Sequence, residues 1–212
     1  MSDPLAIEAL LFGQAGFLEN EAGDDYYTAL RKEYHFLQNK YLLRPINGQL
    51  WKMLRLRPAN FPCVRIAQFA SFVPFLPDFF QHMSRFNWKW LLDCMQTIRP
   101  TEYWHSHYQF NRSSGERIKS MSRQSARNII INGMIPLVYE YSRQTGSEEF
   151  RQNAISILEA LPAESNKILS GWKKLGLNVP NAFYSQGLLQ LKNCYCNLKK
   201  CLYCQIGNQI LR

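Results

Sequence analysis

The segment Trp51-Lys-Met-Leu-Arg-Leu-Arg-Pro-Ala-Asn-Phe-Pro-Cys-Val-Arg-Ile-Ala-Gln68 joins a basic turn to the start of a helix. Pro62 suits the first position of that helix, because its fixed φ is already helical and no N–H is needed there. Arg65 and Gln68 then lie one turn apart on the same face. Guanidinium groups beside a helix N-terminus attract anions, so the segment predicts an anion-binding loop and helix.

The candidate phosphate ligands of this segment are its cations and two amides. An arginine fork binds phosphate through two hydrogen bonds, and Asn60 can either cap the helix that begins at Pro62 or reach the ligand. In the alternative, structural interpretation, arginines in such a turn bind the C-terminal carbonyls of a neighbouring helix. The candidates are Lys52, Arg55, Arg57, Asn60, Arg65 and Gln68.

A second basic run begins at Arg112 inside the loop Asn111–Gly115 and continues beyond it, with Glu116 as its only acid. Arg123 and Arg127 are four residues apart, so they share one helical face. A basic helix after a Ser/Gly loop suits a phosphate backbone, although a solvated helix face has the same pattern. The candidate ligands are Arg112, Arg117, Lys119, Arg123 and Arg127.

The charge of the 212-residue chain is unevenly distributed. Residues 1–30 contain six acids and no Lys or Arg, so the rest of the chain carries 25 basic residues against 10 acidic ones, a net charge of +15. This balance favours a polyanionic partner, and nucleic acid is the commonest one. The alternative is a basic protein whose lysines and arginines serve only solubility.

The apolar periodicity predicts a mainly α fold of about 8–10 helices in an orthogonal or bundle-like array, because no segment alternates over the length of a strand. Asp24 or Asp25 and Asn181 are expected helix caps, and Pro136 should kink a long helix over 120–143. We expect one domain, residues 1–212, with the cysteine-containing tail packed on the body. Two sub-blocks, 1–110 and 116–212, would join at Asn111–Gly115.

The C-terminal tail contains the spacing Cys196-x4-Cys201-x2-Cys204. These three cysteines match part of a plant-type iron–sulfur pattern, and the last two also suit zinc. The fourth ligand would be Cys194 or His107, or another residue brought in by the fold (Cys63, Cys94 or His105). The alternative is that they are free, partly buried thiols.

No catalytic motif identifies an enzyme. His105 and His107 share a face only in an extended chain, where they could bind a metal or form a histidine-centred site. Nucleophile-elbow, Walker and dinucleotide-binding patterns are absent from the sequence. The sequence also lacks a signal peptide and an apolar run of about 20 residues, which predicts a soluble, cytoplasmic protein without membrane contact.

Several segments along the chain form a recognisable set: Ile7–Gly16, Glu33-Tyr34 with Phe36-Leu37, Arg55–Pro62 with Arg65–Gln68, Leu161–Asn166, Ser185-Gln186, and Tyr195-Cys196 through Cys201-Leu202, Cys204 and Ile206-Gly207. Together they resemble the bacterial family called domain of unknown function 2851. The resemblance implies no established activity. It implies that this chain corresponds to the C-terminal half of longer members, whose N-terminal half carries acidic motifs similar to those of restriction-endonuclease-like nucleases. It also emphasises Cys196, Cys201 and Cys204.

These observations favour a helical module that binds nucleic acid or another polyanion, in service of a nuclease-like partner domain. Two alternatives stay open. The first is a structural metalloprotein with a cysteine-ligated zinc or iron–sulfur site, and the second is an enzyme with a histidine-centred site.

Overall fold

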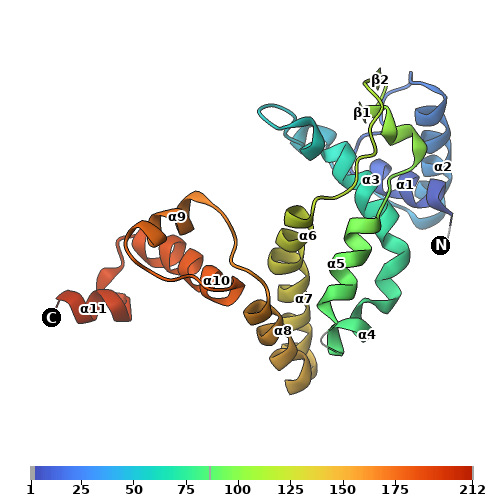
Figure 1. The fold of residues 1–212 in the computed structure, drawn as a ribbon. Helices are drawn as coiled ribbons and strands as arrows, with labels where there is room; N and C mark the ends of the chain where they lie inside the picture. Colours follow the sequence, from blue (N-terminus) through green and yellow to red (C-terminus); the bar gives the residue numbers. More distant parts are fainter. Residues whose placement is uncertain (1–2, 86, 212) are drawn as a thin grey trace. The chain divides into compact units, whose positions relative to one another are not determined.

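The computed structural model describes residues 3–85 and 87–211 and is mainly α-helical, as predicted (Figure 1). The chain forms two compact units. Unit 1 comprises Met1–Phe79 and Leu91–Arg123, and unit 2 comprises Phe80–Trp90 and Gln124–Arg212. The Asn111–Gly115 loop, expected between two blocks, therefore lies inside unit 1, and the short segment Phe80–Trp90 groups with the second half of the chain.

Three helices form the body of unit 1: α1 (Pro4–Gln14), α2 (Asp25–Tyr41) and α3 (Pro62–Phe72). The carboxylates of Asp3 and Asp24 accept main-chain N–H groups at the starts of α1 and α2, which confirms Asp24 as a cap. Two 3-10 turns, η1 (Gly48–Leu50) and η2 (Pro58–Asn60), lie between α2 and α3. Both α2 and α3 pack against α1.

The contact between α1 and α2 depends on a glycine. A Cβ atom at Gly13 would lie 2.0 Å from the ring of Tyr34, so only glycine allows the two helices to approach this closely. The core beside this contact contains Phe12, Leu30 and Trp104, all fully buried. Phe12 stacks on Trp104 with ring centroids 5.1 Å apart, which attaches the segment after residue 100 to the helices.

That segment contains both a 3-10 turn and a strand. The turn η4 (Glu102–His105) leads into β1 (His107–Gln109), which pairs antiparallel with β2 (Arg112–Ser113). The turn between the strands contains Asn111 in the left-handed region at φ 59°, a conformation that asparagine tolerates well. This small hairpin lies against α3.

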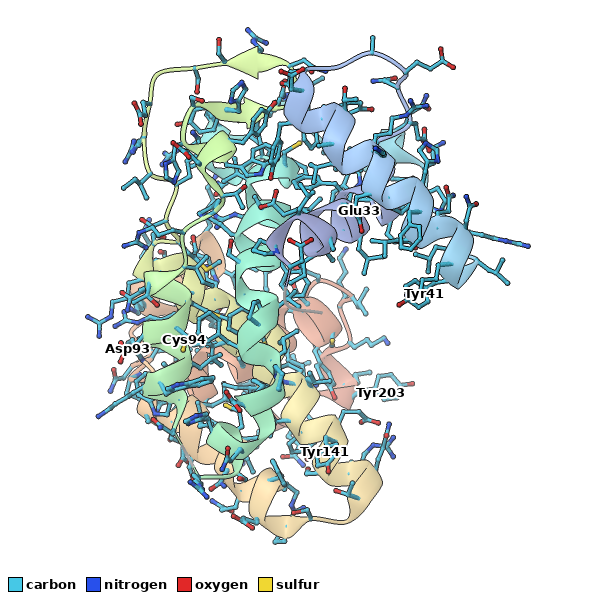
Figure 2. The ribbon with its side chains drawn as sticks, turned by 90° about the vertical axis from the view of Figure 1, so that its right-hand side faces the viewer. Glu33, Tyr41, Asp93, Cys94, Tyr141 and Tyr203 are labelled. Carbon is cyan, nitrogen blue, oxygen red and sulfur yellow. The ribbon has the colours of Figure 1, made fainter. Side chains whose placement is uncertain are left out.

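The chain between α3 and the hairpin contains η3 (Val73–Asp78), α4 (Phe79–Ser84) and α5 (Trp88–Thr97). In the part of α5 that belongs to unit 1, exposed Asp93 lies beside buried Cys94 (Figure 2). The Asn87 carboxamide accepts the main-chain N–H of Trp90 at 3.3 Å, as expected for a cap.

The long helix expected over 120–143 is interrupted near the proline that was expected to kink it. The segment over 120–143 consists of α6 (Arg123–Ile129), the π-helical segment η5 (Ile130–Met134) and α7 (Ile135–Thr145), with Pro136 in the first turn of α7. A π-helical insertion accommodates the missing N–H of the proline and its ring. Gly146, at φ 69°, ends α7, and α8 (Glu148–Ala160) packs back against it.

The remaining helices of unit 2 are α9 (Lys167–Lys174), α10 (Ala182–Gln190), the π-helical segment η6 (Leu191–Cys196), η7 (Cys201–Tyr203) and α11 (Gln205–Leu211). The Asn181 carboxamide caps α10 through the N–H of Tyr184, as predicted. The tail differs from the prediction of a segment packed on the body, because Leu202 and Tyr203 are 72% and 83% exposed. No helix among residues 3–85 and 87–211 is long and apolar enough to cross a membrane.

Candidate nucleic-acid interface

Lys119 anchors the hairpin of unit 1 from the inside. It is only 5% exposed, and its Nζ donates to the main-chain oxygens of Trp104 at 2.6 Å and His105 at 2.8 Å. The ammonium group also lies 4.1 Å from the ring centroid of Tyr108. Burial lowers the pKa of Lys119, and the nearby charge of Arg117 adds to this effect. A residue that we predicted as a phosphate ligand therefore fixes the protein's own backbone.

Gln68 and Arg65 extend this internal network to α3. Gln68, buried at 2% exposure, donates to the main-chain oxygen of Lys119 at 2.8 Å, and its own carbonyl accepts from Arg65 Nη1 at 2.9 Å. Arg65 Nη2 donates to Asn60 Oδ1 at 2.6 Å. The carboxamide of Asn60 thus binds an arginine, whereas Phe61 occupies the N-cap position of α3 without a side-chain hydrogen bond. Four of the predicted ligands form a connection between α3 and the hairpin.

A pocket of about 240 Å³ opens where the basic turn meets the hairpin. We call it the Arg112 pocket. Pro58 and Phe61 line it from the turn and the start of α3, and Tyr108 and Arg112 line it from the hairpin. Both rings are half-buried, while Arg112 is exposed. The two basic segments of the sequence, separated by more than forty residues, therefore meet at a pocket with aromatic walls and one guanidinium group. Its other lining residues are Gln109, Ser113 and Ser114.

The exposed cations of the basic turn directly precede Pro58 of this pocket. Lys52, Arg55 and Arg57 are all exposed, and Leu54 beside them is 87% exposed. Arg55 has φ 61°, in the left-handed region that residues other than glycine rarely adopt. A strained conformation of this kind persists only where the surrounding chain enforces it.

The second basic run is divided between the two units. Arg112 and Arg117 are exposed residues of unit 1, and Arg123 is the last residue of that unit. Arg127 belongs to unit 2, where it is half-buried on α6 and its Nε is shielded from water without a hydrogen-bond partner in the described part of the chain. Only Arg112 of this run lines the Arg112 pocket.

Unit 1 contains a buried carboxylate, Glu8, that no motif in the sequence indicated. Glu8 is 1% exposed and accepts hydrogen bonds from the Tyr26 hydroxyl at 2.5 Å, the Thr101 hydroxyl at 2.9 Å and Trp104 Nε1 at 3.0 Å. Burial raises the pKa of Glu8, and these three hydrogen bonds work against that rise. Its position four residues before Phe12, on the apolar face of α1, was the available signal.

The two histidines of the hairpin segment have different environments. His107 stacks on Tyr103 at 3.9 Å, and its Nδ1 lies 2.9 Å from the main-chain oxygen of Tyr103. It lines an open pocket with Asp24, but the Asp24 carboxylate is occupied by the Tyr103 hydroxyl at 2.6 Å and by its role as the cap of α2. His105 Nε2 is buried and has no hydrogen-bond partner among the described residues. This arrangement does not favour the histidine-centred enzyme.

All six cysteines are free thiols. In the tail, Cys194, Cys196 and Cys201 are exposed and Cys204 is half-buried. Among the described residues, no group of three or more His, Cys, Asp or Glu side chains is arranged to hold a metal ion. The zinc or iron–sulfur site on Cys196, Cys201 and Cys204 therefore stays a prediction. His107, named as a fourth ligand, belongs to unit 1, whereas the tail belongs to unit 2.

The two buried cysteines pack as apolar residues. Burial raises the pKa of the Cys63 thiol to about 12, which keeps it protonated at neutral pH. Cys94 is buried as well, and burial also raises its pKa.

Unit 2 contains a polar group that no sequence motif identified. Asn132 Nδ2 donates to Glu164 at 2.9 Å, and Gln186 donates to the other carboxylate oxygen of Glu164. Asn132 comes from η5, and it lines a pocket with Gln186 and with Asn193 from η6. The π-helical segments that position Asn132 and Asn193 carry no short-range sequence signature, so spacing could not find this group.

The chain was compared with protein-family models, curated proteins and solved structures. A family model described as "Protein of unknown function (DUF2851)" matches residues 1–167. The expected family is confirmed, but the narrower expectation of a C-terminal half is not, and the resembling segments at 185–186 and 195–207 lie outside the match. No curated protein matches the chain, and no solved structure does.

Proposed function

The chain belongs to the DUF2851 family, and because that description assigns no activity, we propose a function from the site itself: binding of a single-stranded nucleic acid at the Arg112 pocket. The observation that carries the proposal is that Phe61, Tyr108 and Arg112 line one pocket. The net charge of +9 supports it by attracting phosphate groups in a sequence-independent way.

The pocket has the chemistry that an unpaired nucleotide requires. A base stacked on an aromatic side chain contributes about 1–3 kcal/mol, and half-buried Phe61 and Tyr108 offer such rings. The exposed Arg112 guanidinium can bind the adjoining phosphate through two hydrogen bonds. Ser113 adds an exposed hydroxyl group beside it.

The size of the pocket favours a single strand over a duplex. Its volume of about 240 Å³ lies below the range of about 300–1,000 Å³ typical of sites that enclose a whole small molecule, so it suits one ring of a longer ligand. Bases reach aromatic side chains only when they are unpaired and splayed out. The exposed cations Lys52, Arg55 and Arg57 would then follow the neighbouring phosphates.

The internal network gives the pocket a fixed shape. The Lys119 ammonium group donates to the main chain of η4, directly before the hairpin, and lies over the ring of Tyr108. Gln68 connects the main chain of Lys119 to α3. A preorganised ring loses little conformational entropy when a base stacks on it. The arginine and lysine of this network thus support the site without contacting the ligand.

The test is fluorescence anisotropy with a labelled single-stranded oligonucleotide of mixed sequence, as DNA and as RNA. Arg112→Glu and Phe61→Leu should each weaken binding about tenfold or more, which matches the loss of one phosphate contact or one stacked base. The matched controls are Lys32→Glu and Phe36→Leu, two exposed residues of α2 outside the pocket. These should bind within about twofold of the unchanged protein.

Two results would count against the proposal. One is the absence of binding at low salt, and the other is equal binding by the pocket variants and their controls. Circular dichroism of each variant separates lost binding from lost folding.

A further inference from the structure

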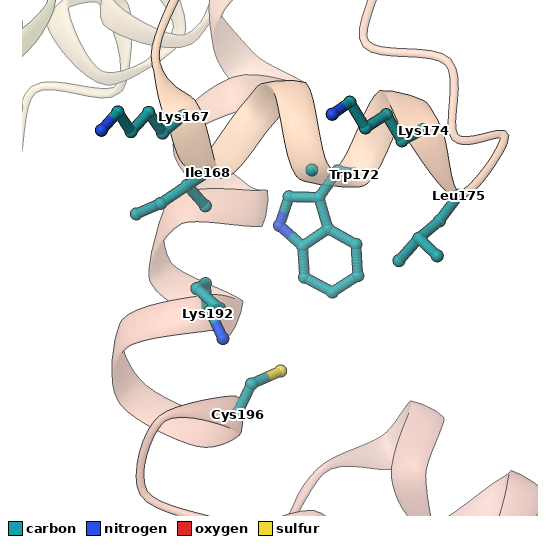
Figure 3. Close-up of a pocket in the computed structure, with 8 residues that line it drawn as sticks. Lys167, Ile168, Trp172, Lys174, Leu175, Lys192 and Cys196 are labelled. Atoms are coloured by element: carbon teal, nitrogen blue, oxygen red, sulfur yellow. The ribbon is translucent and has the colours of Figure 1, made fainter.

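Unit 2 contains a second pocket of about 570 Å³, formed by α9 and η6 (Figure 3). We call it the Trp172 pocket. Trp172 and Leu175 extend from the α9 side, and Cys196 reaches the same space from η6. Its volume lies within the range of about 300–1,000 Å³ that encloses a small molecule.

The walls of this pocket are apolar. Ile168, Trp172 and Leu175 are among its lining residues, and Leu175 is 76% exposed. Small-molecule sites are typically concave and lined mainly by apolar and aromatic side chains, with a few polar or charged groups. The indole of Trp172 offers a large flat face to an apolar ligand.

Trp172 also supplies an unused hydrogen-bond donor. Its Nε1 is shielded from water and finds no hydrogen-bond acceptor in residues 3–85 and 87–211. A buried donor without a partner costs about 1–3 kcal/mol, so a shift of the indole that brings its N–H to a ligand's acceptor would recover this energy.

The charged groups of the Trp172 pocket all have the same sign. Lys167, Lys174 and Lys192 line it, and none of its lining residues in the described structure is acidic. Figure 3 shows Lys167 and Lys174 along α9 and Lys192 on the facing segment. Lysine ammonium groups act as flexible point charges, which suits a single anionic head group.

We propose that the Trp172 pocket binds a small molecule with a hydrocarbon body and one carboxylate group. The body lies against Trp172 and Leu175, and the carboxylate is attracted by the three lysines that line the pocket, of which Lys192 lies beside Cys196 on the segment facing α9. This site belongs to unit 2, whereas the Arg112 pocket belongs to unit 1.

The experiment is isothermal titration calorimetry of the full chain with dodecanoate monomers, with uncharged dodecanol as the second probe. The double variant Lys174→Glu/Lys192→Glu should weaken dodecanoate binding about tenfold or more, and dodecanol should bind the unchanged protein about tenfold more weakly than dodecanoate. Lys173→Glu/Lys200→Glu is the matched control, because both lysines are exposed and neither lines the pocket. It should bind dodecanoate within about twofold of the unchanged protein.

Cysteine alkylation gives an independent readout of the ligand's position. Cys196 lines the pocket and is exposed, whereas its neighbour Cys194 is exposed outside it. Dodecanoate should slow the alkylation of Cys196 by iodoacetamide without slowing that of Cys194, as measured by mass spectrometry. Equal affinities of the two double variants would overturn the proposal, as would unchanged alkylation of Cys196. Binding to anionic vesicles without binding to monomeric dodecanoate would also overturn it, because it would show membrane-surface attraction only.

Discussion

Replacement of Lys119 by methionine tests the internal network that supports the Arg112 pocket. Methionine keeps most of the apolar stem but removes the ammonium group, which donates to two main-chain oxygens at 2.6 Å and 2.8 Å. A hydrogen bond to a charged group contributes about 1.5–3 kcal/mol, and an acceptor left buried without a partner costs about 1–3 kcal/mol.

Two such bonds set an upper range of several kcal/mol, and two effects reduce it. The His105 oxygen keeps the main-chain N–H of Arg117 as a donor, so it is not left without a partner. Burial lowers the pKa of Lys119, so the folded chain already carries a desolvation cost that the variant avoids. We therefore expect the Lys119→Met change to reduce the free energy of unfolding by about 3 kcal/mol. For a protein of this size the melting temperature should fall by about 10 °C.

The assay is urea denaturation followed by circular dichroism, together with a thermal melt. Arg117→Met is the matched control, since Arg117 is an exposed cation two residues away and its main-chain hydrogen bond to His105 does not involve the side chain. The control should change the free energy of unfolding by no more than about 0.5 kcal/mol. A Lys119→Met effect as small as that of the control would refute the role of the buried ammonium group.

Three further predictions concern the stability contributions of Glu8 and Gly13 in unit 1, with Gly187 of unit 2 as a control. Glu8→Ala should lower the free energy of unfolding by about 3 kcal/mol in urea denaturation, because it leaves three hydrogen-bond donors without their acceptor; a loss below about 1 kcal/mol would contradict this. Burial raises the pKa of Glu8 above its ordinary value of 4.5, so the folded state binds the proton more tightly and the Glu8 contribution to stability should decrease as pH rises from 4.5 through the raised pKa. Denaturation at a series of pH values should show this decrease for the unchanged protein and a flatter curve for Glu8→Gln. Gly13→Ala should destabilise the protein by about 1–3 kcal/mol, because the added Cβ would meet the Tyr34 ring. Gly187→Ala, on α10, should stabilise it by about 0.5–1 kcal/mol, because the added Cβ would meet no atom within 4 Å. Thermal melts in which both variants shift the melting temperature in the same direction would contradict the packing at Gly13.

Local sequence signals predicted the helical class and several helix ends. Asp24 and Asn181 cap their helices as expected, because capping depends on a side chain and an N–H only two or three residues apart. The grouping of Phe80–Trp90 with the second half of the chain could not be predicted in this way. It depends on contacts between residues far apart in sequence, such as the hydrogen bond from Asn153 to the main-chain oxygen of Ser84.

The candidate site was predicted in part. The spacing correctly placed Arg65 and Gln68 one turn apart, and they are hydrogen-bonded to each other at 2.9 Å. Their inward direction was not predictable, because the partner of Gln68 is a main-chain oxygen of Lys119, 51 residues away. Lys119 looked like one more cation of a basic run, since nothing local shows that the backbone of η4 provides two acceptors for it.

The aromatic residues of the Arg112 pocket were visible in the sequence but were not assigned to the site. Phe61 follows the basic turn, and Tyr108 precedes Arg112 by four residues. Aromatic residues between arginines are a feature of single-strand binding surfaces, so this interleaving was the available signal. Only the folded chain shows that the two segments line one pocket.

Photo-crosslinking tests the proposed nucleic-acid site most directly. A single-stranded oligonucleotide that contains 4-thiouracil is irradiated with the protein at about 50 mM salt, and the crosslinked peptides are identified by mass spectrometry. Binding at the Arg112 pocket predicts crosslinks to Phe61 or Tyr108, and their loss in Arg112→Glu. Crosslinks confined to residues 124–211, or crosslinks that persist unchanged in Arg112→Glu, would contradict it.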